Sequence, residues 1–289
     1  FMNITERLKN KGFTVSFEVF PPKKSAALEN AKETMKELAA LSPDFISVTY
    51  GAGGGTSQNT IKIASYIQNE LGTSALAHLS CVSSSREEIS HLIDEMKEAK
   101  IENVLALRGD IPQDGMFPEA GYYKYAYQLV EELKERGGFS IGAACYPEGH
   151  IECESKSRDL DYLKAKVDCG CDYLTTQMFF DNSVLYSFLY RALAKGIDVP
   201  VIAGVMPVTN SRQIKRITEL SGTSLTPKFR TILDKFGDND AALKQAGIAY
   251  AIDQIVDLVA NGVRGIHIYT MNKPEVARQI MESLSEILK

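Results

Sequence analysis

The feature that most constrains this chain is a short apolar run that recurs eight times and usually ends in polar side chains. The runs are rich in branched and small apolar residues and are bounded by polar residues, Gly or Pro, which is typical of strands buried on both faces. They occupy residues 14–20, 45–50, 75–81, 103–108, 140–146, 173–179, 200–206 and 265–270. Segments with helical periodicity separate them. This alternation predicts a parallel sheet, and eight strands predict its closure into a (β/α)8 TIM barrel.

The barrel accounts for residues 1–289 as a single domain, because no linker or break in composition divides the chain. Residues 207–264 hold extra helical material between the last two strands. Ser84 and Glu87 have the spacing of a capping box and predict the start of one helix, while Pro274 predicts the first turn of the last helix. An open, doubly wound sheet is the alternative architecture.

The overall composition excludes several classes of protein. The net charge is −5 without a basic stripe, so nucleic acid is not an expected partner. No apolar segment reaches the ~20 residues of a membrane span, and the N-terminal residues lack the apolar core of a signal peptide, so we expect a cytoplasmic protein. The five cysteines form no CxxC pair, which predicts reduced thiols and no metal site. A homo-oligomer stays open, because the sequence marks no interface.

Polar side chains gather at the ends of the predicted strands. In a (β/α)8 barrel the carboxyl ends of all strands meet at one rim, where active sites lie. A polar residue in a buried strand often only satisfies a structural partner, but convergence of many such residues on one rim predicts a site. The polar strand ends are Glu18, Thr49, His78, Arg108, Asp110, Tyr146, His150, Gln177, Tyr269, Asn272 and Lys273.

Glu18 is the strongest candidate for a catalytic group. It lies within the largely apolar stretch SFEVFPP, where desolvation favours the protonated form of a carboxyl group, as a general acid requires. The alternative is a structural ion pair with a strand-end Arg such as Arg108. Asp110 offers an anion that tunes a cofactor or orients a substrate amine, or else it is a turn residue before Ile111-Pro112.

Two further pairs favour a bound organic ligand over a metal. His78 and His150 have no carboxylate or Cys at ligand spacing, so hydrogen bonds to a cofactor are the favoured interpretation. Asp159 and Lys166 lie seven residues apart, about two turns along one helical face. They would reach a ribityl or phosphate group, or else form a solvated surface pair.

The polar strand ends belong to eight motifs whose order and spacing resemble the methylenetetrahydrofolate reductase family. The motifs are FEVFPP (17–22), SVTYGAG (47–53), HLSC (78–81), ALRGD (106–110), AACYPEGH (143–150), TTQMFFD (175–181), MPVTN (206–210) and HIYTMN (267–272). The resemblance is to the short bacterial form, a catalytic domain alone. It implies a FAD enzyme on a (β/α)8 barrel that reduces 5,10-methylenetetrahydrofolate to 5-methyltetrahydrofolate, with hydride passed from NADH or NADPH through flavin N5. Glu18 would be the general acid that assists opening of the folate ring to a 5-iminium cation, and Asp110 would place negative charge between flavin and pterin.

The resemblance assigns the remaining binding residues by motif. Gln177, Gln213 and Lys273 match positions that hold folate, as Glu18 does, or the nicotinamide donor. Lys273 replaces an Arg of some relatives and can meet the glutamate tail of folate, although without bidentate geometry. Ile217 stands where some relatives have an aromatic that stacks on the nicotinamide, so a subunit that takes electrons from a redox partner protein is the alternative function. The implied contacts to FAD are Thr49, Ala52, His78, Arg108, Asp110, Tyr125, Ala144, Tyr146, His150, Asp159 and Lys166.

Overall fold

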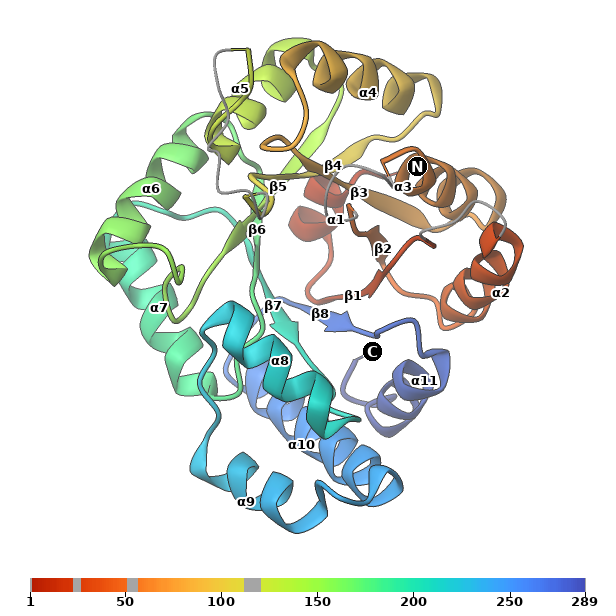
Figure 1. Ribbon diagram of the computed structural model, residues 1–289, viewed down its shortest axis with the longest axis vertical. Coiled ribbons are helices and arrows are strands. Elements are labelled where there is room, and N and C mark those ends of the chain that lie inside the picture. Colours follow the sequence, from red (N-terminus) through yellow and green to blue (C-terminus); the bar gives the residue numbers. More distant parts are fainter. Residues whose placement is uncertain (1, 23–26, 51–56, 112–120, 289) are drawn as a thin grey trace.

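The chain folds into a closed barrel of eight parallel strands. The computed structural model describes residues 2–22, 27–50, 57–111 and 121–288. The strands pair in sequence order, and β8 pairs with β1 to close the ring, which excludes the open sheet (Figure 1). They are β1 (Thr14–Val19), β2 (Phe45–Val48), β3 (Ser74–Ser80), β4 (Asn103–Leu107), β5 (Ser140–Cys145), β6 (Tyr173–Thr176), β7 (Val201–Val205) and β8 (Gly265–Tyr269). Each strand matches a predicted run and ends one to three residues before the end of that run.

Helices cover the outside of the barrel, and their apolar faces pack on the outward side chains of the strands. Phe17 and Val48 lie in this outer core together with Met35 and Ile93 of the helices. The helices are α1 (Ile4–Asn10), α2 (Leu28–Ala39), α3 (Ser57–Ser65), the π-helix η2 (Tyr66–Glu70), α4 (Arg86–Glu98), α5 (Ala126–Arg136), α6 (Lys156–Asp168), α7 (Asn182–Ala194), α8 (Ser211–Ser221), α9 (Pro227–Phe236), α10 (Asp240–Ala260) and α11 (Pro274–Ser283). Within the described ranges, no helix is long and apolar enough to cross a membrane.

The predicted helix starts are partly correct. Pro274 is the first residue of α11, as expected. The capping box of α4 is formed by Ser85 and Glu88, one residue later than predicted: the Ser85 hydroxyl accepts from the Glu88 N–H at 3.2 Å, and the Glu88 carboxylate accepts from the Ser85 N–H at 2.7 Å. Ser84 is buried instead. Two overlapping Ser-x-x-Glu spacings occur there, and the local pattern does not distinguish them.

The short helix α1 covers the N-terminal end of the barrel. Its Ile4 and Leu8 are buried against an apolar layer inside the strands, and the Ile4 N–H donates to the Asn103 side-chain oxygen at 2.9 Å. The inward residues of this layer are Phe45, Leu76, Leu105, Tyr173 and Ile202. Because this end is filled with side chains, the space for a ligand lies at the carboxyl ends of the strands.

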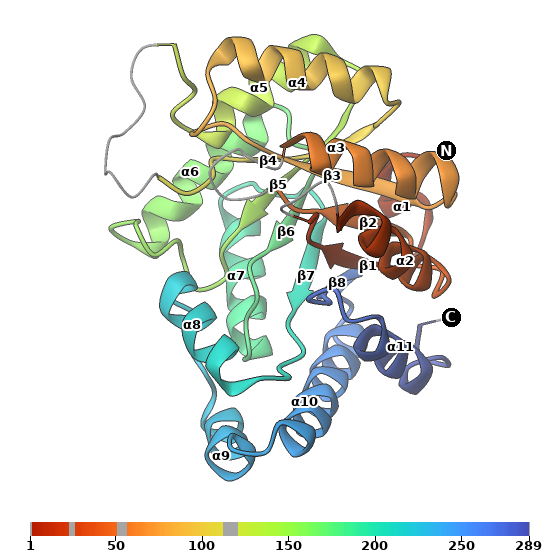
Figure 2. The same cartoon turned by 45° about the vertical axis from the view of Figure 1, so that its right-hand side comes forward.

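The extra helical material predicted between β7 and β8 consists of α8, α9 and α10, which extend the molecule beyond β7 and β8 (Figure 2). Their apolar faces form a small core of their own around Ile214 and Phe229, which packs on Met178 and Phe180 after β6. This core fixes α8 beside the carboxyl ends of the strands.

Candidate active site

A cavity of about 850 Å³ opens at the carboxyl ends of the strands. Its floor is apolar and includes Leu76 and Leu105 of the inner layer. Above the floor the lining becomes more polar, and seven residues predicted from the sequence take part in it. They are Glu18, Thr49, His78, Ala144, Tyr146, Gln177 and Tyr269. An apolar cavity with a few convergent polar groups is the usual form of a small-molecule site.

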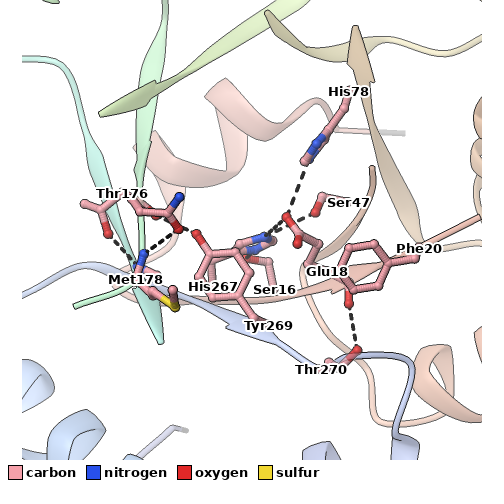
Figure 3. Close-up of polar contacts among 12 residues, drawn as sticks. Ser16, Glu18, Phe20, Ser47, His78, Thr176, Met178, His267, Tyr269 and Thr270 are labelled. Atoms are coloured by element: carbon pink, nitrogen blue, oxygen red, sulfur yellow. Dashed lines mark hydrogen bonds and ion pairs between the residues drawn. The ribbon is translucent and has the colours of Figure 1, made fainter. Parts of the chain in front are cut away.

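Glu18 projects into this cavity between two imidazole rings (Figure 3). Its Oε2 lies 3.6 Å from Nε2 of His267 and 3.9 Å from Nε2 of His78. The side chain of Glu18 is 12% exposed, so the carboxyl group is almost fully removed from bulk water. The alternative that Glu18 pairs with Arg108 is wrong, because Arg108 pairs with Glu152 across the rim at 2.6 Å.

His267 is a member of the site that was not singled out from the sequence. Its Nδ1 lies 2.7 Å from the Ser16 hydroxyl, which donates to the Ile266 carbonyl at 3.1 Å, and its Nε2 lies 3.2 Å from the Ser47 hydroxyl. Because the Ser16 hydroxyl donates to that carbonyl, its oxygen is free to accept from Nδ1–H of His267, and Nε2 then carries the lone pair of the neutral ring. The lone pair of Nε2 then faces both Ser47 and Glu18. The period of two in β8 could have revealed His267, because a strand residue between two core isoleucines points into the barrel.

His78 contributes a neutral imidazole beside Glu18. Burial is the largest effect on its ring and lowers the pKa of His78 to about 4, although the nearby Glu18 opposes this shift. Its Nε2 has no hydrogen-bond partner among the described residues. At neutral pH the His78 ring beside Glu18 is therefore uncharged.

Tyr269 and Asn272, two polar strand ends from β8 and its loop, have structural partners. The Tyr269 hydroxyl donates to the Thr176 carbonyl at 2.6 Å, across the mouth of the barrel. The Asn272 amide bonds both backbone groups of Phe20, at 2.8 and 2.9 Å. Gly204 of β7 lies so close to this contact that a Cβ there would be 2.4 Å from the Thr176 oxygen. A side chain at position 204 would therefore displace the wall between β6 and β8.

A second polar region lies around β4, β5 and α6. The Tyr146 ring meets His150 edge to face, with 4.6 Å between the centroids. Lys166 reaches the wall of the cavity from α6 and donates to the Ala144 carbonyl at 2.8 Å. Burial lowers the pKa of Lys166 and raises that of Asp159. The alternative that Asp159 and Lys166 form a solvated surface pair is wrong, because both side chains are half-buried.

The pair of Arg108 and Glu152 joins this region to the loop after β5. The hydrogen bond to Glu152 raises the pKa of Arg108, and the Arg108 guanidinium lowers that of Glu152. Glu148 in the same loop also has a protein partner. Its carboxylate accepts a hydrogen bond from the Ser224 N–H at 3.0 Å and so connects this loop to the segment after α8.

Four of the remaining predicted residues, Asp110, Tyr125, Gln213 and Lys273, lie outside the cavity lining. Asp110 is exposed and follows Gly109, whose φ of +86° turns the chain after β4. Tyr125 is exposed before α5 and stacks on Tyr127. Lys273 donates to the Thr209 hydroxyl at 2.8 Å. Gln213 lies in the first turn of α8, and Ala52 lies outside the described residues.

Among the described residues, no group of three His, Cys, Asp or Glu side chains is placed to hold a metal ion. The five cysteines form no disulfide, and burial raises the pKa of the Cys81 thiol to about 12.

Comparisons with known proteins identify the family of this chain. A family model described as methylenetetrahydrofolate reductase matches residues 3–285. The chain is 37% identical over 270 residues to the 5,10-methylenetetrahydrofolate reductase of Pectobacterium carotovorum subsp. carotovorum, covering 93% of this chain and 89% of that relative. It is 35% identical over 303 residues to the methylenetetrahydrofolate reductase (NADH) 1 of Arabidopsis thaliana, covering 99% of this chain and 51% of that relative.

A solved structure supports the fold. An uncharacterized protein from Clostridium thermocellum, which binds two copies of 5-methyl-5,6,7,8-tetrahydrofolic acid, superposes with a TM-score of 0.66 at 15% identity. The match covers 98% of this chain and 99% of that one. With a family model over nearly its whole length, this chain belongs to the methylenetetrahydrofolate reductase family.

Proposed function

We propose that this protein reduces 5,10-methylenetetrahydrofolate to 5-methyltetrahydrofolate with FAD as cofactor and NADH or NADPH as electron donor. The observation that carries the proposal is the position of Glu18, a desolvated carboxyl group that projects into the cavity of a member of this family. Opening a cyclic aminal to a cation requires a proton donor, and the resulting positive charge is stabilised by a nearby carboxylate.

The residues present fit a bound FAD. Three buried polar atoms of cavity-lining residues lack hydrogen-bond partners in the described part of the chain, and they are Oη of Tyr50, Nε2 of His78 and Oγ1 of Thr175. Lys166, whose pKa is lowered by burial, has no acidic partner there within ion-pair distance. Ring heteroatoms would satisfy polar groups that line the cavity, and a phosphate or ribityl oxygen would satisfy Lys166. FAD, when bound, supplies hydride transfer between the nicotinamide donor and the folate.

The residues proposed to hold FAD divide between the cavity and the region around it. Thr49, His78, Ala144 and Tyr146 line the cavity. The wall formed by β5 and α6 is surrounded by Arg108, His150, Asp159 and Lys166. The proposed set also includes Asp110, Tyr125 and Ala52. Gln177 in the lining, with Gln213 and Lys273 at the rim, is proposed for folate or the nicotinamide donor.

Glu18 holds the proton that assists ring opening at folate N10. His267 is placed to exchange that proton, because its Nε2 faces the Glu18 carboxyl at 3.6 Å and its orientation is fixed by Ser16 and Ser47. His78 is neutral and adds no positive charge that would oppose a folate cation. Asp110 supplies negative charge at the rim.

The test separates the two half-reactions. In Glu18→Gln, reduction of the bound flavin by NADH should continue, whereas reoxidation by methylenetetrahydrofolate should slow at least about 100-fold because the proton donor is lost. Rapid-mixing absorbance of the flavin measures both rates. Glu98→Gln, which changes an exposed glutamate of α4, is the matched control. Loss of both half-reactions in Glu18→Gln would assign Glu18 a structural role.

Asp110 is tested by a potential as well as a rate. Asp110→Asn removes negative charge near the proposed flavin, so the flavin potential should rise and the folate half-reaction should slow. A redox titration that gives the wild-type potential would contradict this role.

A second function is a folate- and flavin-binding subunit that receives electrons from a partner protein. The supporting observation is Ile217, which lacks an aromatic surface for nicotinamide and is half-buried against the small core of α8 and α9. Anaerobic NADH or NADPH should bleach the flavin of the isolated protein if it uses its own donor. A flavin that neither donor bleaches would favour the partner protein.

A further inference from the structure

The inner face of β6 carries a hydroxyl group that the protein itself does not satisfy. Thr175 lines the cavity and is 6% exposed, and its Oγ1 has no hydrogen-bond partner in the described part of the chain. Its neighbour Thr176 differs, because the Thr176 hydroxyl accepts from the Gly204 N–H at 2.8 Å. Both threonines line the cavity, but the hydroxyl of Thr176 has a partner within the wall and that of Thr175 has none among the described residues.

An unpartnered buried hydroxyl is unfavourable, so its partner is expected to come from the cavity that it lines. Several polar side chains near Thr175 already have protein partners: Ser16 and Ser47 contact His267, and the Tyr269 hydroxyl donates to the Thr176 carbonyl. The hydroxyl of Thr175, like that of Tyr50 and like Nε2 of His78, is left to a bound molecule.

The strand register indicates which bound molecule would be the partner of the Thr175 hydroxyl. Thr175 is the direct partner of Ala144 on β5, and both line the cavity. Neighbouring strands lie about 4.8 Å apart, so a ring that touches Ala144 is within reach of the Thr175 hydroxyl. Ala144 belongs to the residues proposed to contact FAD. A flavin ring has carbonyl oxygens and ring nitrogens along one edge, which suit a group that both donates and accepts.

We propose that Thr175 is a positioning residue for the flavin, and that its hydroxyl hydrogen bonds the polar edge of the isoalloxazine ring. This proposal rests on the FAD assignment above and adds a residue to it. The pterin of folate has similar ring chemistry, and the experiment separates the two ligands.

The test compares substitutions that remove or keep one hydroxyl. Thr175→Val preserves the shape of the side chain and removes the hydroxyl, so the dissociation constant of FAD should rise roughly three- to tenfold, the range of one neutral hydrogen bond. The visible bands of bound flavin should shift, and thermal unfolding of the protein without FAD should be unchanged or improved. Thr175→Ser should restore both the affinity and the spectrum.

Thr14→Val is the matched control. Thr14 is also a buried threonine whose hydroxyl has no partner among the described residues, but it lies at the first position of β1, away from the cavity lining. Its substitution should leave the FAD dissociation constant unchanged.

Titration of the protein with FAD, followed by flavin fluorescence, gives the affinities. Wild-type affinity and an unshifted spectrum in Thr175→Val would overturn the proposal, even if the KM for folate rose, because that result would assign Thr175 to the pterin. A wild-type protein that does not bind FAD would instead overturn the proposed function, and the two failures are therefore distinguishable.

Discussion

The two polar regions at the mouth of the barrel are built differently. On the side of β1, β3 and β8, the functional side chains belong to the strands themselves: Glu18, His78 and His267 are buried and point inward. On the side of β4, β5 and α6, most belong to loops or to a helix, and the pair of Arg108 and Glu152 is partly open to solvent. A residue in a barrel strand is held in place by backbone hydrogen bonds to the strands on both sides, whereas the position of a loop residue depends on a few contacts.

This difference indicates that the two regions suit different functions. The strand-borne region is rigid and desolvated, which suits proton transfer at a defined atom, since such chemistry tolerates little displacement. The loop-borne region carries a guanidinium and an ammonium on adaptable elements, which suits capture of a large charged ligand. Changes in the first region should therefore alter chemistry and acid stability, and changes in the second should alter affinity.

The largest effect expected in the strand-borne region is on acid stability. The pKa of His78 is about 4 in the folded protein against 6.5 for an ordinary histidine, because burial disfavours the charged ring. Between these values the unfolded chain binds more protons, so stability is retained above pH 6.5 and is lost as the pH falls toward 4. At about 1.4 kcal/mol for each pH unit, the loss is on the order of 3 kcal/mol.

His78→Gln should remove this part of the acid sensitivity. Denaturant unfolding of wild type and variant at pH 7 and pH 4 gives the free energy of unfolding. The difference in this free energy between the two proteins should become smaller or change sign at pH 4. His91→Gln, at an exposed position of α4, is the control and should follow the wild type. Parallel pH profiles for His78→Gln and wild type would show that His78 is not desolvated in solution.

The next effect concerns proton exchange with Glu18. His267→Asn removes the Nε2 atom that faces the Glu18 carboxyl, so the folate half-reaction should slow by about tenfold to 100-fold, a smaller effect than that of Glu18→Gln. Reduction of bound flavin by NADH should change little. Ser47→Ala removes only a 3.2 Å contact to the same ring and should have a weaker effect. Equal losses in both half-reactions of His267→Asn would indicate displaced flavin rather than lost proton exchange.

The sequence predicts the strand-borne region well. Apolar runs typical of buried strands place Glu18 and His78 on strands, and the count of eight strands predicts that their polar groups meet at one rim of a closed barrel. His267 is not among the residues predicted from the sequence, although its alternation with Ile266 and Ile268 of the outer core indicates that it points into the barrel.

The loop-borne region is less predictable, because its contacts join residues far apart in the chain. The bond from Arg108 to Glu152 spans 44 positions and depends on how the loop after β5 folds back. The capping register at Ser85 likewise follows from which serine is buried. Neither result is encoded in a local pattern.

A stability effect of intermediate size tests the wall that separates the two regions. Thr176→Val leaves the buried Gly204 N–H without its acceptor, which should lower the free energy of unfolding by about 1 to 3 kcal/mol. The neighbouring Thr175→Val should not lower it, because no bond of the described structure is lost there. Denaturant unfolding without FAD compares the two variants. Equal destabilisation would mean that Thr175 also has a protein partner in solution.

The smallest effect is expected for the loop-borne ion pair. Glu152 is half exposed, so its pair with Arg108 adds little to stability in water. The carboxylate nevertheless neutralises a guanidinium that we propose as a contact to FAD. Glu152→Gln should therefore lower the dissociation constant of FAD about two- to fivefold at low salt, because the anionic ligand no longer competes with Glu152. High salt should remove this gain, since screening weakens exposed charges. Glu154→Gln, at an exposed position two residues further on, should show neither change. Weaker FAD binding in Glu152→Gln would mean that Glu152 orients Arg108 for the ligand, and the loop-borne region would then be as preorganised as the strand-borne one.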